Sequence, residues 1–219
     1  MDEGNIHVFK KVSSIGFAIL GPNMIRKMAS VKIVTPELYD REGYPVDGGL
    51  MDTRLGVIDP GLKCKTCGSK LKDCTGHFGY IELARPVVHI KLVDVIMILL
   101  RCTCNECARV LTPQASISQY ISNLEKVRRE RGIQPYEDKI KKVIASLRII
   151  KKCPHCNKKQ DKIKIEKPST FLENDKKISP IEIRMRLEKI PDDDLLIFGI
   201  NASAFRPEWS VLTILGIPP

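Results

Sequence analysis

The sequence predicts an irregular α+β fold in which a helical hairpin, short strands and long loops are braced by bound metal. Its eight cysteines include three Cys-x2-Cys pairs, a spacing that suits a single metal ion and that chance rarely gives. Apolar residues recur at helical spacing in two consecutive segments, 115–131 and 136–150. Residues 35–61 are rich in Gly and Pro, and an irregular loop of that length is usually functional or braced by something.

The elements before residue 102 are short. Gly21 and Pro22 mark the start of a short helix, because proline is favoured at the first helical position. Residues 31–34 predict a strand, and the alternating residues 80–83 predict another. Residues 90–101 are strongly apolar and predict a buried helix.

The segment 115–150 predicts an antiparallel helical hairpin with one apolar seam. Gly132 and Pro135 interrupt the helical pattern, and so divide it into two helices. The seam positions follow helical spacing in both halves: Ile117, Tyr120, Ile121, Leu124 and Val127, then Ile140, Val143, Ile144 and Leu147.

The remaining elements are two strands and a helix. Residues 162–166 and 211–215 predict the strands. Ser179, Pro180 and Glu182 form a capping box that begins a helix over 180–190, stopped by Pro191. Three acids, Asp192–Asp194, follow; they could bind magnesium, but a helix start, where acids favour the dipole, is the better interpretation.

Composition bounds the class of protein. With 43% hydrophobic and 28% charged residues, the chain is typical of a globular protein. No segment approaches the ~20 uninterrupted apolar residues of a membrane helix. The N-terminus lacks the basic start and apolar stretch of a signal peptide, so a cytoplasmic location is expected. The ending at Ile217–Pro219, without a polar tail, suggests a piece of a longer protein.

The positive charge is concentrated in one segment. The formal net charge is +10, and residues 126–168 hold 15 Lys and Arg against 5 Asp and Glu, so the whole excess lies there. Such a segment suggests a polyanionic partner, most often nucleic acid. A solvated helical hairpin with a Lys-rich loop is an equally good explanation of the charge alone.

The first metal site is predicted at Cys64, Cys67, Cys74 and His77. These residues have the spacing Cys-x2-Cys-x6-Cys-x2-His, and Gly68 and Gly76 ease the turns beside the ligands. Zinc takes four such ligands in structural sites. Four protein ligands leave no open position, so the site is expected to be structural and not catalytic.

The second metal site is predicted at Cys104, Cys107, Cys153 and Cys156. It combines two Cys-x2-Cys pairs from the two ends of the helical hairpin, so a metal would join those ends. Cys102 is the competing ligand, but a buried free thiol is its better interpretation. His155 lies between two ligands and is expected to point away from the metal.

Catalytic signatures are missing from the sequence. It has no P-loop, no G-x-G-x-x-G, no G-x-S-x-G and no H-E-x-x-H. An isolated enzyme is therefore disfavoured. A free-standing zinc-binding regulator that binds nucleic acid remains an alternative to a module of a larger assembly.

Three stretches give the chain a family resemblance. They are Gly48-Gly-Leu-Met-Asp-Thr-Arg-Leu-Gly56, the first zinc motif through Phe78 and Gly79, and Ile81-Glu-Leu-Ala-Arg-Pro-Val-Val-His89. Together they resemble the N-terminal region of the largest subunit of DNA-directed RNA polymerase, of the archaeal or eukaryotic type. Cys104–Leu111 and Arg206–Pro219 extend the resemblance. The short second insertion looks archaeal.

The resemblance implies a mobile clamp that closes over template DNA, held together by two zinc ions on the eight predicted ligands. It implies four segments: 1–60, clamp core; 61–101, first zinc knuckle and buried helix; 102–168, clamp head with the second zinc site; and 169–219, return to the core. It also implies that the enzyme's magnesium-binding aspartates lie beyond residue 219, so this chain has no catalytic residue and would be inactive alone. Expected partners are other polymerase subunits, DNA, and initiation and elongation factors.

The DNA-binding candidates are basic residues of the segment 126–168. They would contact phosphates without reading sequence. They are Lys126, Arg128, Arg129, Arg131, Lys139, Lys141, Lys142, Arg148, Lys151 and Lys152.

Overall fold

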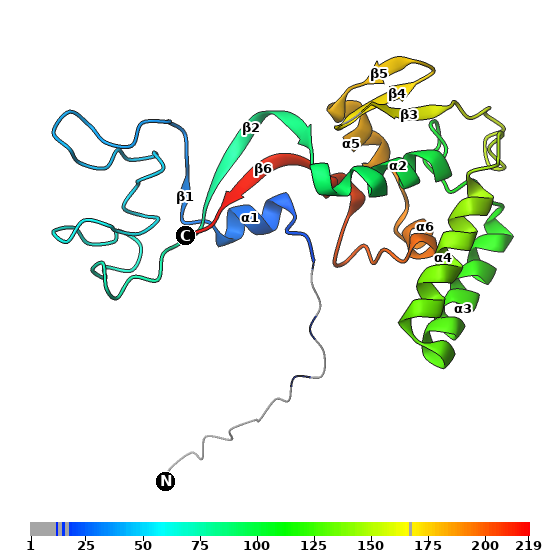
Figure 1. The fold of residues 1–219 in the computed structure, drawn as a ribbon, viewed down its shortest axis with the longest axis horizontal. Coiled ribbons are helices and arrows are strands. Elements are labelled where there is room, and N and C mark those ends of the chain that lie inside the picture. The colour runs from blue at the N-terminus through cyan, green and yellow to red at the C-terminus, as the bar shows by residue number, and fades with distance from the viewer. Residues whose placement is uncertain (1–11, 13–14, 16–17, 167) are drawn as a thin grey trace, which may run out of the picture.

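The computed structural model describes residues 12, 15, 18–166 and 168–219. The signal-peptide prediction and the start of the predicted segment 1–60 lie outside these residues. Within them the fold is α+β, as expected, with helices around two small sheets (Figure 1). No helix in these ranges combines the length and apolar character needed to cross a membrane.

One sheet lies at the centre of the molecule. Its strands are β1 (Val31–Lys32), β2 (Gly79–Val88) and β6 (Val211–Ile217). β2 pairs in parallel with β1 and antiparallel with β6, with Gly79 opposite Ile217 and Val88 opposite Val211. Helix α1 (Pro22–Met28) begins at the predicted proline and lies against β6 (Figure 1).

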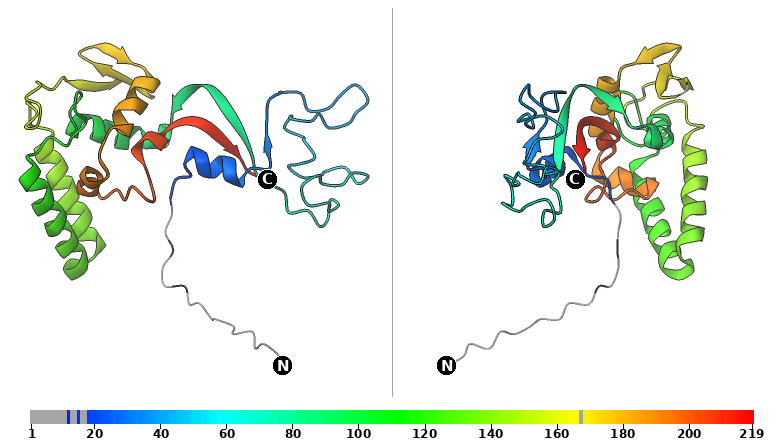
Figure 2. Two further views of the ribbon diagram at one scale, coloured as in Figure 1. Left: turned by 180° about the vertical axis from the view of Figure 1, so that it is seen from behind. Right: turned by 60° about the vertical axis from the view of Figure 1, so that its left-hand side comes forward.

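The segment between β1 and β2 contains the predicted irregular loop, 35–61, followed by the first four predicted ligands. It forms one side of the molecule, and its only pairing among described residues is an isolated bridge between Tyr39 and Pro45. The β2–β6 ribbon connects this side to the helical side (Figures 1 and 2). At the helical end of the ribbon the chain leaves and returns at one place, because His89 N–H donates to Ser210 O at 2.9 Å.

The helical side holds the main hydrophobic core. Its central helix is α2 (Val93–Cys102), preceded by a 3-10 turn at Ile90–Leu92. Around it lie α3 (Gln114–Arg131), α4 (Ile133–Leu147), α5 (Pro180–Glu188), α6 (Asp192–Leu195), and 3-10 turns at Leu196–Phe198 and Pro207–Ser210. Ile96, Leu187, Leu195 and Ile197 are completely buried there.

The helical hairpin is confirmed as α3 and α4, packed side by side (Figure 1). Ile117, Leu124, Val143 and Leu147 are its buried seam residues. The predicted boundary at Pro135 was wrong, because α4 begins at Ile133 and includes the proline in its first turn. Backbone N–H groups in the first turn of a helix have no partner within the helix, so proline, which has no N–H, is tolerated there.

The second sheet was only partly predicted. β3 (Ile163–Glu166) matches the expected strand, but β4 (Thr170–Glu173) and β5 (Lys176–Ile178) were missed. These two strands are too short to show alternation. Their turn has Asn174 and Asp175 at φ of +49° and +65°, a conformation that asparagine and aspartate tolerate better than most residues.

Candidate metal centres

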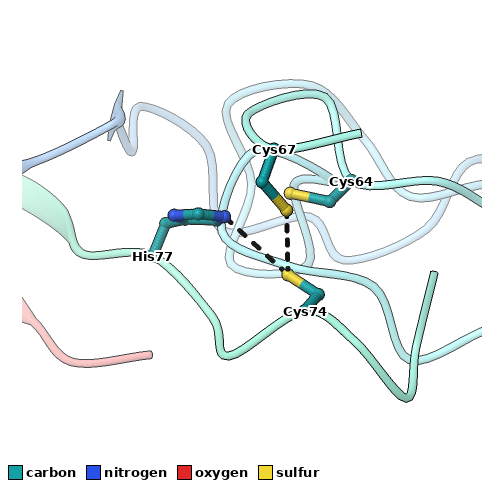
Figure 3. A group of neighbouring side chains, drawn as sticks. All are labelled: Cys64, Cys67, Cys74 and His77. Carbon is teal, nitrogen blue, oxygen red and sulfur yellow. Dashed lines mark hydrogen bonds between the residues drawn. The ribbon is translucent and has the colours of Figure 1, made fainter. Parts of the chain in front are cut away.

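The first centre gathers the four predicted ligands in the segment between β1 and β2. The Sγ atoms of Cys64, Cys67 and Cys74 and a ring nitrogen of His77 all lie within 4.8 Å of one another. Cys74 Sγ is 3.7 Å from Cys67 Sγ and 3.8 Å from His77 Nε2, and the four side chains converge (Figure 3). The structure therefore brings together all four residues that the spacing predicts.

A tight turn after Cys64 aims the first two sulfurs at one point. Thr66 N–H donates to Cys64 Sγ at 3.4 Å, and Gly68 N–H donates to Cys64 O at 2.8 Å. Cys64 N–H donates to Ser69 O at 2.9 Å, which closes the turn. The turn requires φ of +73° at residue 68, a conformation that glycine adopts without steric cost.

Segment 48–56 forms the wall behind this centre. Thr53 O accepts from Lys65 N–H at 3.1 Å, Arg54 O accepts from the Thr66 hydroxyl at 2.7 Å, and Leu55 O accepts from His77 N–H at 2.7 Å. The ligand loop is thus hydrogen-bonded to segment 48–56 at both of its ends.

Asp52 holds the shape of that wall, a role that the sequence did not suggest. Its buried carboxylate accepts from Gly48 N–H and Arg54 N–H at 2.5 and 2.8 Å, and from the Arg54 guanidinium at 2.6 Å. Burial acts to raise the pKa of Asp52, but the hydrogen bonds from Arg54 and Gly48 outweigh it and bring the pKa down to about 2.

The second centre gathers the other four predicted ligands. The Sγ atoms of Cys104, Cys107, Cys153 and Cys156 lie within 4.8 Å of one another. Cys104 Sγ is 3.5 Å from Cys156 Sγ, and Cys107 Sγ is 3.7 Å from Cys153 Sγ. One pair follows α2 and the other follows α4, so the centre joins the two ends of the helical hairpin.

Both halves of the second centre repeat the turn of the first. Glu106 N–H donates to Cys104 Sγ and His155 N–H donates to Cys153 Sγ, each at 3.4 Å. The residues in the position of Gly68 are Ala108 and Asn157, with φ of +56° and +61°. Three separate segments therefore fold into one turn type although only the first has glycine at the left-handed position.

Side chains also connect the two halves. The Lys158 ammonium lies 3.5 Å from the Glu106 carboxylate, and Asn105 donates to Asp161 at 3.1 Å. The His155 ring is not a ligand in this arrangement, since its Nε2 lies 3.2 Å from Val110 O. His155 points away from the sulfurs as expected, but onto the opposite half of the centre and not into solvent.

Both donor sets fit zinc. Four cysteines, or three cysteines and a histidine, are the ligands of structural zinc sites. The thiols do not ionise alike. Burial and the neighbouring thiols raise the pKa of Cys107 to about 12, whereas at Cys104 burial is outweighed by hydrogen bonds, which lower the pKa to about 7. A bound dication would stabilise the thiolate form of every cysteine in its centre.

Cys102 lies outside both centres. It is completely buried in the main core, with its Sγ 3.9 Å from Ile144 O. Burial raises its pKa to about 11, as expected for an inert thiol.

The three acids after Pro191 do begin a helix, α6, but two of them form ion pairs. Asp192 pairs with Arg206. Asp194 is fully buried and accepts from Arg109 Nε at 2.8 Å and from Val110 N–H at 3.0 Å. Among the described residues the two cysteine centres are the only clusters of potential metal ligands, so no magnesium cluster forms here.

All ten DNA-binding candidates are exposed. Three have carboxylate partners on their own helix: Lys126 with Glu130, Arg129 with Glu125, and Lys141 with Asp138. Arg128 lies over the Tyr136 ring, 5.6 Å from its centroid. In the part of the chain that the structure describes, no carboxylate lies within ion-pair distance of the other six, which are Arg131, Lys139, Lys142, Arg148, Lys151 and Lys152.

The chain is similar to known proteins over nearly all of its length. Residues 9–219 match the family described as RNA polymerase Rpb1, domain 1. The chain is 49% identical over 213 residues to DNA-directed RNA polymerase subunit Rpo1N of Methanothermobacter thermautotrophicus, covering 97% of the chain and 24% of that subunit. It is 49% identical over 218 residues to the Thermoplasma acidophilum subunit, covering 97% and 24%. For the Methanocaldococcus jannaschii subunit the identity is 45% over 216 residues, covering 96% and 16%. The chain thus spans a quarter or less of the length of these relatives.

Proposed function

Because this chain belongs to the RNA polymerase Rpb1 domain 1 family, we propose that it is the clamp module of the largest subunit of an archaeal DNA-directed RNA polymerase. The match over residues 9–219 carries the proposal, and the Rpo1N relatives support it. The clamp closes over template DNA and holds it while the enzyme, a nucleotidyltransferase, synthesises RNA. A free-standing zinc-binding regulator is not favoured, since the relatives that cover this chain are polymerase subunits.

The chain contributes architecture and no catalytic residue. The magnesium-binding aspartates belong to the rest of the enzyme, and the chain alone should be inactive. Segment 102–168 would be the clamp head, segments 1–60 and 169–219 the clamp core, and segment 61–101 the first zinc knuckle and buried helix. Its partners would be other polymerase subunits, DNA, and the initiation and elongation factors that dock on the clamp, in the cytoplasm.

The two centres would each hold one structural zinc ion. The ligands would be Cys64, Cys67, Cys74 and His77 in one centre and Cys104, Cys107, Cys153 and Cys156 in the other. Zinc would supply folding free energy to loops that have little core, since the irregular loop has few buried apolar side chains. Rigid loops of this kind let the clamp swing as one body.

Metal analysis tests the two centres. Purified protein should contain two zinc ions per chain, and Cys104→Ser should lower this to one. Cys102→Ser is the matched control, because Cys102 lies outside both centres, and it should keep two. One zinc ion in the unmutated protein would rule out the second site.

The DNA surface would use the basic side chains that no carboxylate neutralises. Lys139 and Lys142 lie three residues apart on α4 and so share one side of that helix. In the second centre Lys152 lies opposite Lys159 in an antiparallel bridge. Like charges in that position repel one another, and a phosphate between them would relieve the repulsion.

DNA binding tests this surface. Lys139→Glu with Lys142→Glu should weaken binding of duplex DNA and reduce the slope of log affinity against log salt by about two, since each phosphate contact contributes about 0.9. Lys70→Glu with Lys72→Glu is the charge-matched control on the other side of the molecule, where both side chains are exposed. Equal losses in both double variants would show that only net charge matters and would remove the assigned surface.

A further inference from the structure

Gln160 reaches from one half of the second centre to the other. It follows the Cys153–Cys156 turn, and its backbone N–H donates to Lys151 O at 2.8 Å, which fixes it to its own half. Its side chain crosses to the Cys104 half. There Nε2 donates to Cys104 Sγ at 3.3 Å, and Oε1 accepts from Asn105 N–H at 3.1 Å.

The contact makes Cys104 different from the cysteines in the same position of the other two turns. Cys64 and Cys153 each accept one N–H, from the backbone two residues later. Cys104 accepts the corresponding bond from Glu106 N–H at 3.4 Å and the Gln160 amide as well. Among the described residues, no other side-chain N–H of Asn, Gln, Lys or Arg donates to a sulfur of either centre.

An amide donor at this sulfur has a clear physical role. Four thiolates around a dication leave an excess of two negative charges, and hydrogen bonds to the sulfurs stabilise that excess. The amide also fixes the direction of the Cys104 side chain, because its oxygen is held by Asn105 N–H at the same time. A carboxylate in place of the amide would keep the acceptor and lose the donor.

We propose that Gln160 is a positioning residue of the second metal centre, which orients Cys104 and stabilises its thiolate through the Nε2–H···Sγ hydrogen bond across the two halves. The inference rests on the proposed metal site and adds to it a residue that is not a ligand. Loss of the amide should loosen the metal in this centre and leave the first centre unchanged. Outer hydrogen-bond partners of metal ligands typically account for about 10–100-fold in affinity.

The test uses the full chain loaded with 113Cd²⁺, whose resonance distinguishes a four-cysteine site from a site of three cysteines and one histidine. Gln160→Met removes all three hydrogen bonds of the amide, with Cys104 Sγ, Asn105 N–H and Lys158 O, at nearly constant size, and Gln160→Glu keeps the acceptor alone. Gln134→Met is the matched control on an exposed position of α4. Each protein is then challenged with EDTA, and the loss of each resonance is followed in time.

The expected result is specific to one centre. In Gln160→Met and Gln160→Glu the four-cysteine resonance should change its chemical shift, and its metal should leave about 10–100-fold faster. The other resonance and both resonances of Gln134→Met should match the unmutated chain. A shift in Gln160→Glu, which keeps the acceptor bond, comes from the lost donor and the added negative charge, and a shift in the uncharged Gln160→Met shows the effect without that charge.

Two results would overturn the inference. One is a four-cysteine resonance in both Gln160 variants with the same chemical shift and the same rate of metal release as in the unmutated chain. The other is equal acceleration at both centres, which would mean general loosening of the fold. Failure of the unmutated chain to bind cadmium at the four-cysteine site would instead remove the metal site itself.

Discussion

A buried carboxylate, Asp52, determines the local structure beside the first centre. Its carboxylate accepts five hydrogen bonds, which join Gly48 and Arg54 at the two ends of one turn. Gly49 in the same turn cannot carry a side chain, because a Cβ there would lie 2.2 Å from Glu37 O. Segment 48–56, one of the stretches through which the chain resembles its family, thus owes its residue types to the backbone turn around Asp52.

Asp52→Asn should destabilise the protein at pH 7. The folded protein lowers the pKa of Asp52 from 3.8 to about 2, and a shift of that size corresponds to about 2 kcal/mol of unfolding free energy. Chemical denaturation measures this loss. Asp47→Asn is the matched control, because Asp47 pairs with Lys65 on the surface and both side chains are more than half exposed, so it should change stability little.

The same residue predicts a pH dependence. The pKa of Asp52 is lower in the folded state, so its contribution is fully present above the ordinary value of 3.8 and is lost as pH falls through about 2. The difference in unfolding free energy between the unmutated chain and Asp52→Asn should therefore narrow from pH 4 to pH 2. A constant difference over that range would contradict this assignment.

At the scale of elements, α6 connects to the second centre through one ion pair. Asp194 in its first turn receives the Arg109 side chain and the Val110 backbone, both just after the Cys104–Cys107 turn. A helix of four residues thereby fixes the edge of the second centre through Arg109, which lies 85 residues earlier in the chain.

Asp194→Ala should be strongly destabilising. It removes the buried partner of Arg109 and leaves Val110 N–H without its acceptor. Breaking a buried pair in this way lowers the free energy of unfolding by about 3 kcal/mol or more. The melting temperature measures it. Asp193→Ala removes an exposed acid from the same turn and should cost far less; similar losses in both variants would show that only helix capping matters.

Local sequence patterns predicted the helices and strands. Roles that depend on a partner distant in the sequence were not predicted. The α3–α4 hairpin and the two clusters of cysteine and histidine side chains were predictable because their signals lie in short spacings. Only the side chain of Ser179 in the predicted capping box behaves as expected: it accepts from Glu182 N–H at 3.2 Å, while the Glu182 carboxylate turns to Arg186 instead. Asp194, Gln160 and Asp52 carry no such signal, because burial and tertiary partners define their roles.

At the scale of the whole molecule, the helical side is an insertion between two paired strands. β2 ends at Val88 and β6 begins at Val211, and the intervening chain returns to its starting point at the hydrogen bond between His89 and Ser210. The insertion contains α2 to α6, the β3–β5 sheet, the second centre and most of the main core. The first and last residues of the insertion therefore contact each other directly, and no other part of the molecule is needed to bring them together.

Residues 89–210 should fold as a separate protein. Their core is nearly complete, lacking only Val88 and Val211 at the junction, and the four ligands of the second centre are all present. We expect a cooperative thermal transition and one bound zinc ion per chain, measured by calorimetry and metal analysis. The complementary control is a chain in which a short Gly-Ser linker replaces 89–210, which should bind zinc at the first centre only. An unfolded 89–210 segment would mean that the β2–β6 ribbon is needed to form the core.

The pairing of β2 with the distant strand β6 sets the order in which parts of the protein can fold during synthesis. The four ligands of the first centre span residues 64–77, so they can meet soon after they leave the ribosome. β2 follows at once, but its antiparallel partner is made only after residues 89–210. At about 5–20 residues per second, that is a delay on the order of 6–25 s. During this delay β2 has an open edge, and Glu82, Arg85 and Pro86 along it are the residue types that discourage pairing with another nascent chain.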